Sequence, residues 1–289
     1  MVKQEVMNTA ILLISCPDRK GIVREIAGFI ADNGGNIVHF DQHIDYQKGI
    51  FFARVEWDIS EFRIPKEEIE SSFKPTAERF SMNYSLHFSD TPQRVAIFVS
   101  KQGHCFYDLM QRFRSGELKG EVKLVISNHE DMRPLAEFFG VPYHYIPKSR
   151  ENKRSAEEKE LQLLEESKID TIVLARYMQI LSKDFVERFR NRIINIHHSF
   201  LPAFPGAKPY HRAFNRGVKI IGATSHYVTE LLDEGPIIEQ DIIRVSHRDS
   251  LEDFIRKGKD IEKVVLARAV KWHLEHKVLV YDNRTVVFD

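Results

Sequence analysis

The chain lacks several features that would assign it to a specialised class of protein. Its 289 residues include only two cysteines, Cys16 and Cys105, which lie far apart in the sequence and do not form a disulfide framework. So few cysteines are typical of a reducing compartment. No apolar run reaches the length of a membrane span, and the first ten residues lack the apolar stretch of a signal peptide. We therefore expect a soluble, cytoplasmic protein with no membrane partner.

An excess of charge of one sign is also missing. Lysine plus arginine total 42, aspartate plus glutamate total 42, and the formal net charge is zero. Because no overall positive field attracts a polyanion, we expect no nucleic-acid partner. Residues 1–90 carry 10 − 14 = −4 and the remainder carries 32 − 28 = +4. This mild split favours the second part of the chain as the host of an anionic ligand.

The common nucleotide-binding and hydrolytic motifs are absent as well. No G-x-G-x-x-G follows a strand-like run and no G-x-x-x-x-G-K-[ST] occurs, which argues against dinucleotide and P-loop nucleotide sites. G-x-S-x-G and H-E-x-x-H are also missing, which argues against an α/β-hydrolase serine and a helical zinc site. Four histidines could still gather around a metal, but no pair has helical ligand spacing and no cysteine is near: His197, His198, His211 and His226. We expect neither a metal nor a cofactor, and we interpret Cys105 as a buried packing residue rather than a nucleophile.

What the chain does contain is enough apolar sequence for two domains. Apolar residues make up 43% and charged residues 29%, a globular composition. From Thr9 to Phe88 the pattern is strand, helix, strand, strand, helix, strand, with a hairpin-like connection near Gly49. This order predicts a ferredoxin-like βαββαβ domain over 1–90, an antiparallel sheet with both helices on one face.

A different pattern follows the segment 89–92. Buried-looking, β-branched runs alternate with helical segments up to a long helix near 251–276. Continuous apolar strands separated by helices predict a doubly wound, mainly parallel sheet, which makes the chain an α/β protein with a second domain over 91–289. Ligands of such sheets bind beyond the carboxyl ends of the strands.

Polar side chains occur where one such strand ends. The run N-I-H-H-S-F-L-P places Asn195 and His197 two residues apart, and Asp233 precedes a Gly-Pro turn after an apolar stretch. Taken alone, the asparagine can satisfy backbone groups and the aspartate can cap a turn.

Taken together, the motifs resemble the folate-dependent formyltransferase family. They are N-I-H-x-S-x-L-P-x-x-x-G from Asn195, then G-x-T-x-H-x-V from Gly222, then L-D-x-G-P-I-I from Leu232. The first part, with C-P-D-R-K-G-I-V from Cys16, resembles an ACT domain, and Q-G-H-C-F-Y-D-L resembles a signature of the deformylase branch. An ACT domain before a formyltransferase-like domain is similar to the formyltetrahydrofolate deformylase family.

The resemblance implies roles for particular residues. Asn195, His197 and Asp233 are the expected catalytic trio. A folate pocket is expected from two further segments: Met178, Gln179, Ile180 and Leu181 as one wall, and Val228, Thr229, Glu230 and Leu231 as the edge that meets the pterin. Gln179 stands where the transferases commonly have a basic residue.

The implied reaction is hydrolysis of 10-formyltetrahydrofolate to formate and tetrahydrofolate, which supplies formate for purine synthesis and balances one-carbon pools. The loop 100–107 has one glycine and several bulky side chains, a poor cradle for a phosphorylated amine acceptor, so water is the expected acceptor. Formyl transfer to a small amine is the alternative, and a non-catalytic folate and amino-acid sensor is a second one.

The ACT-like domain implies two further properties. Its loop residues Asp18, Arg19 and Gly21 are candidates for binding an amino-acid effector, although Asp18 can simply cap the following helix and Gly21 can simply allow a tight turn. Exposed strand edges in 9–88 predict a homo-oligomer.

Overall fold

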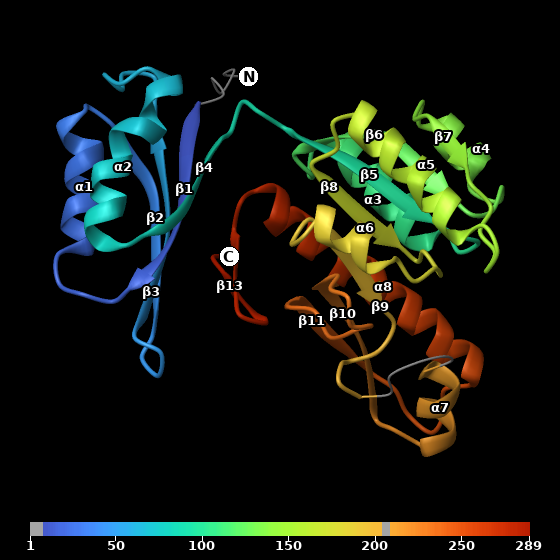
Figure 1. The fold of residues 1–289 in the computed structure, drawn as a ribbon. Coiled ribbons are helices and arrows are strands. Elements are labelled where there is room, and N and C mark those ends of the chain that lie inside the picture. Colours follow the sequence, from blue (N-terminus) through green and yellow to red (C-terminus); the bar gives the residue numbers. More distant parts are fainter. Residues whose placement is uncertain (1–7, 204–208) are drawn as a thin grey trace, which may run out of the picture. The chain divides into compact units, whose positions relative to one another are not determined.

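The computed structural model describes residues 8–203 and 209–289, which form two compact units (Figure 1). The first unit extends to residue 92 and includes 276–279 and 286–289. The second contains 93–275 and 280–285. The boundary expected at residue 90 lies close to this division, whereas two short stretches at the C-terminal end belong to the first unit. Gly206, the last position of the first formyltransferase-like motif, lies outside the described residues.

The first unit has the expected ferredoxin-like arrangement. Its strands form one antiparallel sheet in the order β2-β3-β1-β4, and both helices cover the same face (Figure 1). A short 3₁₀ turn, Lys66–Glu68, precedes the second helix. The elements are β1 (Thr9–Pro17), α1 (Ile22–Asp32), β2 (Asn36–Asp45), β3 (Ile50–Asp58), α2 (Ile69–Phe80) and β4 (Asn83–Phe88).

Helix α1 follows from its sequence pattern. Ile22, Ile26 and Ile30 recur every four residues, are all buried, and belong to the same core cluster as Trp57. Gly21 stands immediately before the helix with φ 96°, a backbone conformation that favours glycine. No side chain caps this end, so the alternative in which Asp18 caps the helix is wrong, while the tight turn at Gly21 is confirmed.

The second unit is built on a seven-stranded sheet in the order β11-β10-β9-β8-β5-β6-β7. The five strands from β9 to β7 pair in parallel, and β10 and β11 add an antiparallel edge, which confirms the mainly parallel prediction. The strands are β5 (Gln93–Val99), β6 (Gly120–Ser127), β7 (Tyr143–Tyr145), β8 (Thr171–Ala175), β9 (Ile193–His197), β10 (Ile220–Tyr227) and β11 (Ile237–Arg244).

Helices lie along both faces of this sheet (Figure 1). They are α3 (His104–Ser115), α4 (Arg133–Phe138), α5 (Lys153–Glu166), α6 (Lys183–Arg188), α7 (Pro209–Arg216) and α8 (Leu251–Leu274). Strand β7 was not expected, because three residues are too few for a periodic signal. A hairpin of β12 (Val278–Tyr281) and β13 (Arg284–Val287) was not expected either.

The strand order places the site. The chain builds β5, β6 and β7 in one direction and then returns to β8 on the other side of β5, so the direction of winding reverses between β5 and β8. At such a reversal, the loops that leave the two strands separate and open a crevice beyond their carboxyl ends. Parallel pairing of β8 with β9 sets Leu174 beside Asn195 at this edge.

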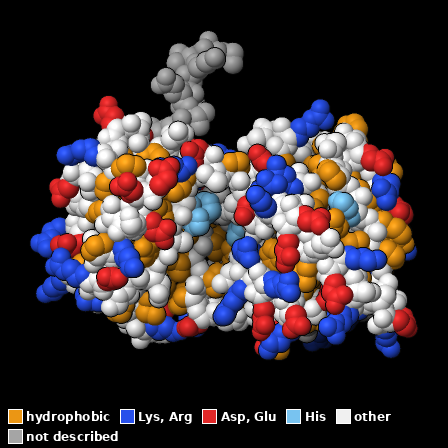
Figure 2. All heavy atoms as spheres, turned by 45° about the horizontal axis from the view of Figure 1, so that its top comes forward, with side chains coloured by type: hydrophobic (Ala, Val, Ile, Leu, Met, Phe, Trp, Pro, Cys, Tyr) orange, Lys and Arg blue, Asp and Glu red, His pale blue; other side chains and the backbone are white. Residues whose placement is uncertain are grey.

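The surface agrees with the balanced composition. On the face drawn in Figure 2, basic and acidic side chains are interspersed with hydrophobic ones over both units. Of the helices in the described ranges, none combines the length and the apolar character needed to cross a bilayer.

Candidate active site

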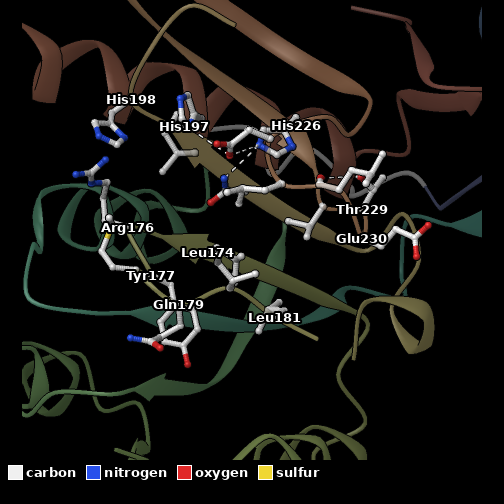
Figure 3. Close-up of a pocket in the computed structure, with 18 residues that line it drawn as sticks. Leu174, Arg176, Tyr177, Gln179, Leu181, His197, His198, His226, Thr229 and Glu230 are labelled. Carbon is white, nitrogen blue, oxygen red and sulfur yellow. Dashed lines mark hydrogen bonds and ion pairs between the residues drawn. The ribbon is translucent and has the colours of Figure 1, made fainter. Parts of the chain in front are cut away.

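A cavity of about 280 Å³ opens beyond the carboxyl ends of β8 and β9 (Figure 3). All three expected catalytic residues and all eight expected folate-pocket residues line it, so the structure brings together segments up to 55 positions apart. The lining residues are Leu174, Arg176, Tyr177, Met178, Gln179, Ile180, Leu181, Asn195, Ile196, His197, His198, His226, Val228, Thr229, Glu230, Leu231, Leu232 and Asp233.

Strand β9 positions two of the catalytic candidates. Asn195 and His197 are two residues apart, and successive side chains of a strand alternate between its faces, so both point to the same side. His197 is 5% exposed. Its Nε2 atom is buried and has no hydrogen-bond partner among the described residues. A buried imidazole nitrogen without a partner, on the wall of a cavity, is available to a ligand.

The loop after β10 carries Asp233 to the same point. Tyr227 donates its backbone N–H to the carbonyl of Pro236 at 2.9 Å, which closes the loop. At Gly235 a Cβ atom would overlap the backbone oxygen of Tyr227, so this close approach requires glycine. Asp233 has φ 59°, a conformation that aspartate and asparagine tolerate better than most residues. Its Oδ1 lies 3.2 Å from His197 Nδ1.

His226 is a member of the site that the sequence argument listed only as a possible metal ligand. It faces Asn195 in the antiparallel register of β9 and β10, and its Nε2 lies 3.2 Å from Asn195 Nδ2. The other ring nitrogen, Nδ1, is 2.9 Å from the carbonyl of Tyr227. Because a carbonyl only accepts, Nδ1 carries the proton, and Nε2 of the neutral ring accepts from the amide. The sequence signal that could have identified His226 is its position as the histidine of the motif G-x-T-x-H-x-V.

Asp233 and His198, both on the wall of the cavity, have shifted pKa values. Burial acts to raise the pKa of Asp233, but the hydrogen bond from His197, and next the neighbouring ring of His226, outweigh burial and hold that pKa well below its ordinary value. Burial, and next the positive charge of Arg176, lower the pKa of His198 to about 4. An ionised Asp233 and a neutral His198 therefore share the cavity at neutral pH.

The expected folate wall is held from behind by buried polar groups. The hydroxyl of Tyr177 donates to Glu160 Oε1 at 3.0 Å, and the backbone N–H of Met178 donates to Ser100 Oγ at 3.0 Å. Lys148, whose side chain is 1% exposed, lies 2.8 Å from Glu160 Oε2. In front of this support, the side chains of Met178 and Ile180 are each 61% exposed.

The opposite wall is formed by 228–232. Leu231 and Leu232 are 57% and 61% exposed, so apolar surface faces the cavity from both sides. Glu230 forms an ion pair of 2.9 Å with Lys183, at the start of α6. Leu232 was not among the expected residues. Exposed apolar side chains on two walls suit a flat aromatic ligand.

The expected effector residues lie on the loop between β1 and α1. The guanidinium of Arg19 lies 5.4 Å from the ring centre of Phe80 and donates to the carbonyl of Arg79 at 3.4 Å. The backbone N–H of Asp18 donates to the backbone carbonyl of Gly49 at 2.8 Å.

Within the described part of the chain, one group of side chains has the spacing of a metal site: His104, Cys105 and Glu262. Both oxygens of Glu262 are already used, because His104 Nε2 lies 2.7 Å from Oε2 and the Tyr210 hydroxyl donates to Oε1 at 2.6 Å. Arg176 Nε lies 3.5 Å from Oε2. Burial holds the pKa of the Cys105 thiol well above its ordinary value. A cation beside the carboxylate and a protonated thiol do not suit a divalent metal ion.

Comparison with known proteins gives the family. Residues 93–270 match the formyl transferase family model, and residues 10–71 match the ACT domain model. The chain is 59% identical to the formyltetrahydrofolate deformylase of Synechocystis sp., over 97% of this chain and 98% of that one. It is 52% identical to the Bacillus subtilis deformylase, over 96% and 93% of the two chains.

A solved structure agrees with the sequence relatives over both units. The crystal structure of a formyltetrahydrofolate deformylase from Pseudomonas syringae matches with a TM-score of 0.97 at 47% identity, covering 99% of this chain and 96% of that one. The matches cover both units of this chain, the ACT domain and the formyl transferase domain that follows it. The chain therefore belongs to the formyltetrahydrofolate deformylase family.

Proposed function

We propose that the protein hydrolyses 10-formyltetrahydrofolate to formate and tetrahydrofolate. The contact between Asp233 and His197, in a cavity with apolar walls, is the observation that carries this proposal. It provides a base beside a surface that suits a pterin.

The chemistry follows from the atoms that face the cavity. Asp233 accepts from His197 Nδ1, which leaves Nε2 as the nitrogen directed to the substrate. Neutral Nε2 accepts a proton from the attacking water, and the resulting imidazolium is stabilised by Asp233. Asn195 has two amide protons; one engages His226, and the other is free to donate to the formyl oxygen as negative charge develops there. The proton held at His197 then passes to the departing N10.

Water is the proposed acceptor because the loop 100–107 is filled. Ser100 donates to Asn128 Oδ1 at 2.7 Å, and a Cβ atom at Gly103 would overlap the sulfur of Met132. His104 is engaged by Glu262. With side chains occupying the space beside it, this loop is not an open phosphate cradle, which disfavours a phosphorylated amine acceptor.

Incubation with 10-formyltetrahydrofolate alone tests the proposal. Hydrolysis releases formate and tetrahydrofolate without any added amine. If formate appears only as a formylated amine when a small amine is added, the protein is a transferase. Folate binding without any turnover would identify the non-catalytic sensor.

We further propose a cytoplasmic enzyme that needs no metal or cofactor and supplies formate for purine synthesis. The ACT domain is proposed to bind an amino acid at 18–21, where the N-terminus of α1 presents free N–H groups to a carboxylate. Screening the common amino acids for a shift in activity or melting temperature tests this. No effect from any of them would leave assembly as the role of the domain.

A further inference from the structure

One charged side chain on the wall of the cavity has no role in the mechanism above. Arg176 is the first residue after β8 and has φ 64°, a left-handed conformation that costs energy for a residue other than glycine. A strained backbone conformation of this kind persists only where the surrounding structure holds the residue in place. Figure 3 shows that the guanidinium is directed toward His198 and away from the Gln179 and Tyr177 side chains of the folate wall.

The charge of Arg176 is buried and only partly compensated. The residue is 8% exposed, and its Nε atom has no hydrogen-bond partner among the described residues. The nearest carboxylate, Glu262, lies 3.5 Å from Nε, too far for a good hydrogen bond, and both of its oxygens are bound by His104 and Tyr210. A buried guanidinium in this state favours a second anion on its open side. That side faces the cavity, because Arg176 lines it.

His198 completes this corner of the cavity. Its ring centre lies 5.3 Å from that of His197 and 5.9 Å from that of Tyr210. His198 therefore lies between the catalytic candidates and Tyr210, the residue that donates to Glu262. The ring is neutral at neutral pH and so offers one N–H donor. A guanidinium with parallel donors and an adjacent imidazole N–H match the two oxygens of a small carboxylate.

We propose that Arg176 and His198 form the binding site for the formate product. This inference rests on the proposed hydrolysis. In that reaction water adds its oxygen to the formyl carbon and the bond from that carbon to N10 breaks. One proton of the water passes to N10, and the other is lost when formic acid ionises to formate. The formate that results is an anion formed beside ionised Asp233, which repels it. Arg176 supplies the opposite charge within the same cavity and draws formate away from the base.

Direct binding of ¹³C-formate, measured by NMR without folate, tests the site independently of turnover. Arg176→Gln should weaken binding about 10- to 100-fold, the usual effect of losing hydrogen bonds to a charged group. It should raise the inhibition constant of formate by the same factor. Arg188→Gln is the matched control, because Arg188 lies on α6 in an exposed ion pair with Glu165; it should bind formate as the wild type does.

A second variant guards against loss of the fold. The single variant Arg176→Gln removes a cation beside the buried carboxylate of Glu262, which can destabilise the fold. The double variant Arg176→Gln with Glu262→Gln removes both buried charges. The double variant should fold and should show the same loss of formate binding. Wild-type binding in either variant would overturn the proposal. Inorganic phosphate that displaces formate at lower concentration than formate itself binds would also overturn it, and would point to a phosphorylated ligand.

The two proposals fail in different ways. If no formate is released from 10-formyltetrahydrofolate yet Arg176 binds added formate, the hydrolysis is wrong and the anion site stands. If formate is released but Arg176→Gln binds formate normally, the hydrolysis stands and the product site is wrong.

Discussion

Asn195 and His226 lie opposite each other across strands β9 and β10, with Asn195 Nδ2 3.2 Å from His226 Nε2. This contact fixes the orientation of the amide, because His226 is itself held by the carbonyl of Tyr227. An amide that is already oriented loses little entropy when it stabilises an oxyanion. The antiparallel edge of the sheet therefore contributes to the geometry of the candidate active site.

Asp233→Asn should lower kcat by about 10²- to 10⁴-fold, the usual contribution of a general base or its partner. Asparagine has nearly the same shape and tolerates the positive φ of this position, so the loop should keep its conformation. Folate binding depends mainly on the apolar walls and should stay within a few fold. Steady-state kinetics and equilibrium binding separate the two effects.

The neighbouring Glu234 is exposed and serves as the control for this change. Glu234→Gln should retain wild-type kcat. If Asp233→Asn bound folate poorly but turned over normally at saturation, the role of Asp233 would be binding and the mechanism would be wrong.

The pH dependence of the same variant follows from the lowered pKa of Asp233. Its carboxylate is ionised between about pH 5 and pH 9, so changes of wild-type kcat with pH within that range come from other groups of the site. Because the folded-state pKa is the lower one, stabilisation by Asp233 is complete above its unfolded pKa of about 3.9 and is lost as the pH falls toward the folded value. Urea unfolding of both proteins should show their difference narrowing below about pH 4. A difference that widens there would contradict the assignment.

Lys148→Met should destabilise the second unit by roughly 3–5 kcal/mol, because it leaves two buried carboxylates without their cation. Lys148 lies 2.8 Å from Glu160 and 3.7 Å from Glu157, and burial already raises the pKa of Glu160. Since Glu160 accepts from Tyr177, KM should rise as the folate wall loosens. Arg154 on α5 is 94% exposed and pairs with Glu158, so Arg154→Met should change stability by about 1 kcal/mol at most. Equal denaturation midpoints for the two variants would refute the prediction.

Exhaustive chelation should leave activity unchanged. Both ring nitrogens of His226 are engaged, by the Asn195 amide and the carbonyl of Tyr227, and both oxygens of Glu262 are occupied by protein donors. The measurement is formate release after treatment with EDTA, with zinc added back. Activity that is lost with EDTA and restored by zinc would mean that the histidines are metal ligands.

The full chain should sediment as a homo-oligomer at micromolar concentration. Strand β2 lies at one edge of the first sheet and carries Val38, which is 43% exposed. Lysine on an edge strand opposes strand pairing, so Val38→Lys should shift the protein toward the monomer. Tyr46→Lys, in the turn after β2, should not. A wild-type monomer would end this proposal.

Much of the architecture could be read from local patterns. The spacing of Ile22, Ile26 and Ile30 predicts α1 because a helix places every fourth residue on one face. The uninterrupted apolar run of β8 predicts a strand that is buried on both sides. The motifs around Asn195, His197 and Asp233 predicted which residues gather at the cavity, since motif spacing records how a family folds. Strand β7 was not predicted, because a strand of three residues is too short to show a periodic pattern.

The pairings inside the cavity were decided by the tertiary structure. No feature of the sequence predicts that His226 lies opposite Asn195. The register in which β9 and β10 pair places these two residues opposite each other. Nothing local sets Arg176 beside Glu262, 86 residues later, where α8 brings a carboxylate to the end of β8. Sequence determined which residues a strand or helix presents, because that depends on short-range periodicity. Only the packed sheet decided which polar atoms meet. It also decided which buried atoms, such as His197 Nε2 and Arg176 Nε, find no hydrogen-bond partner in the described residues, because those facts depend on contacts between segments far apart in the chain.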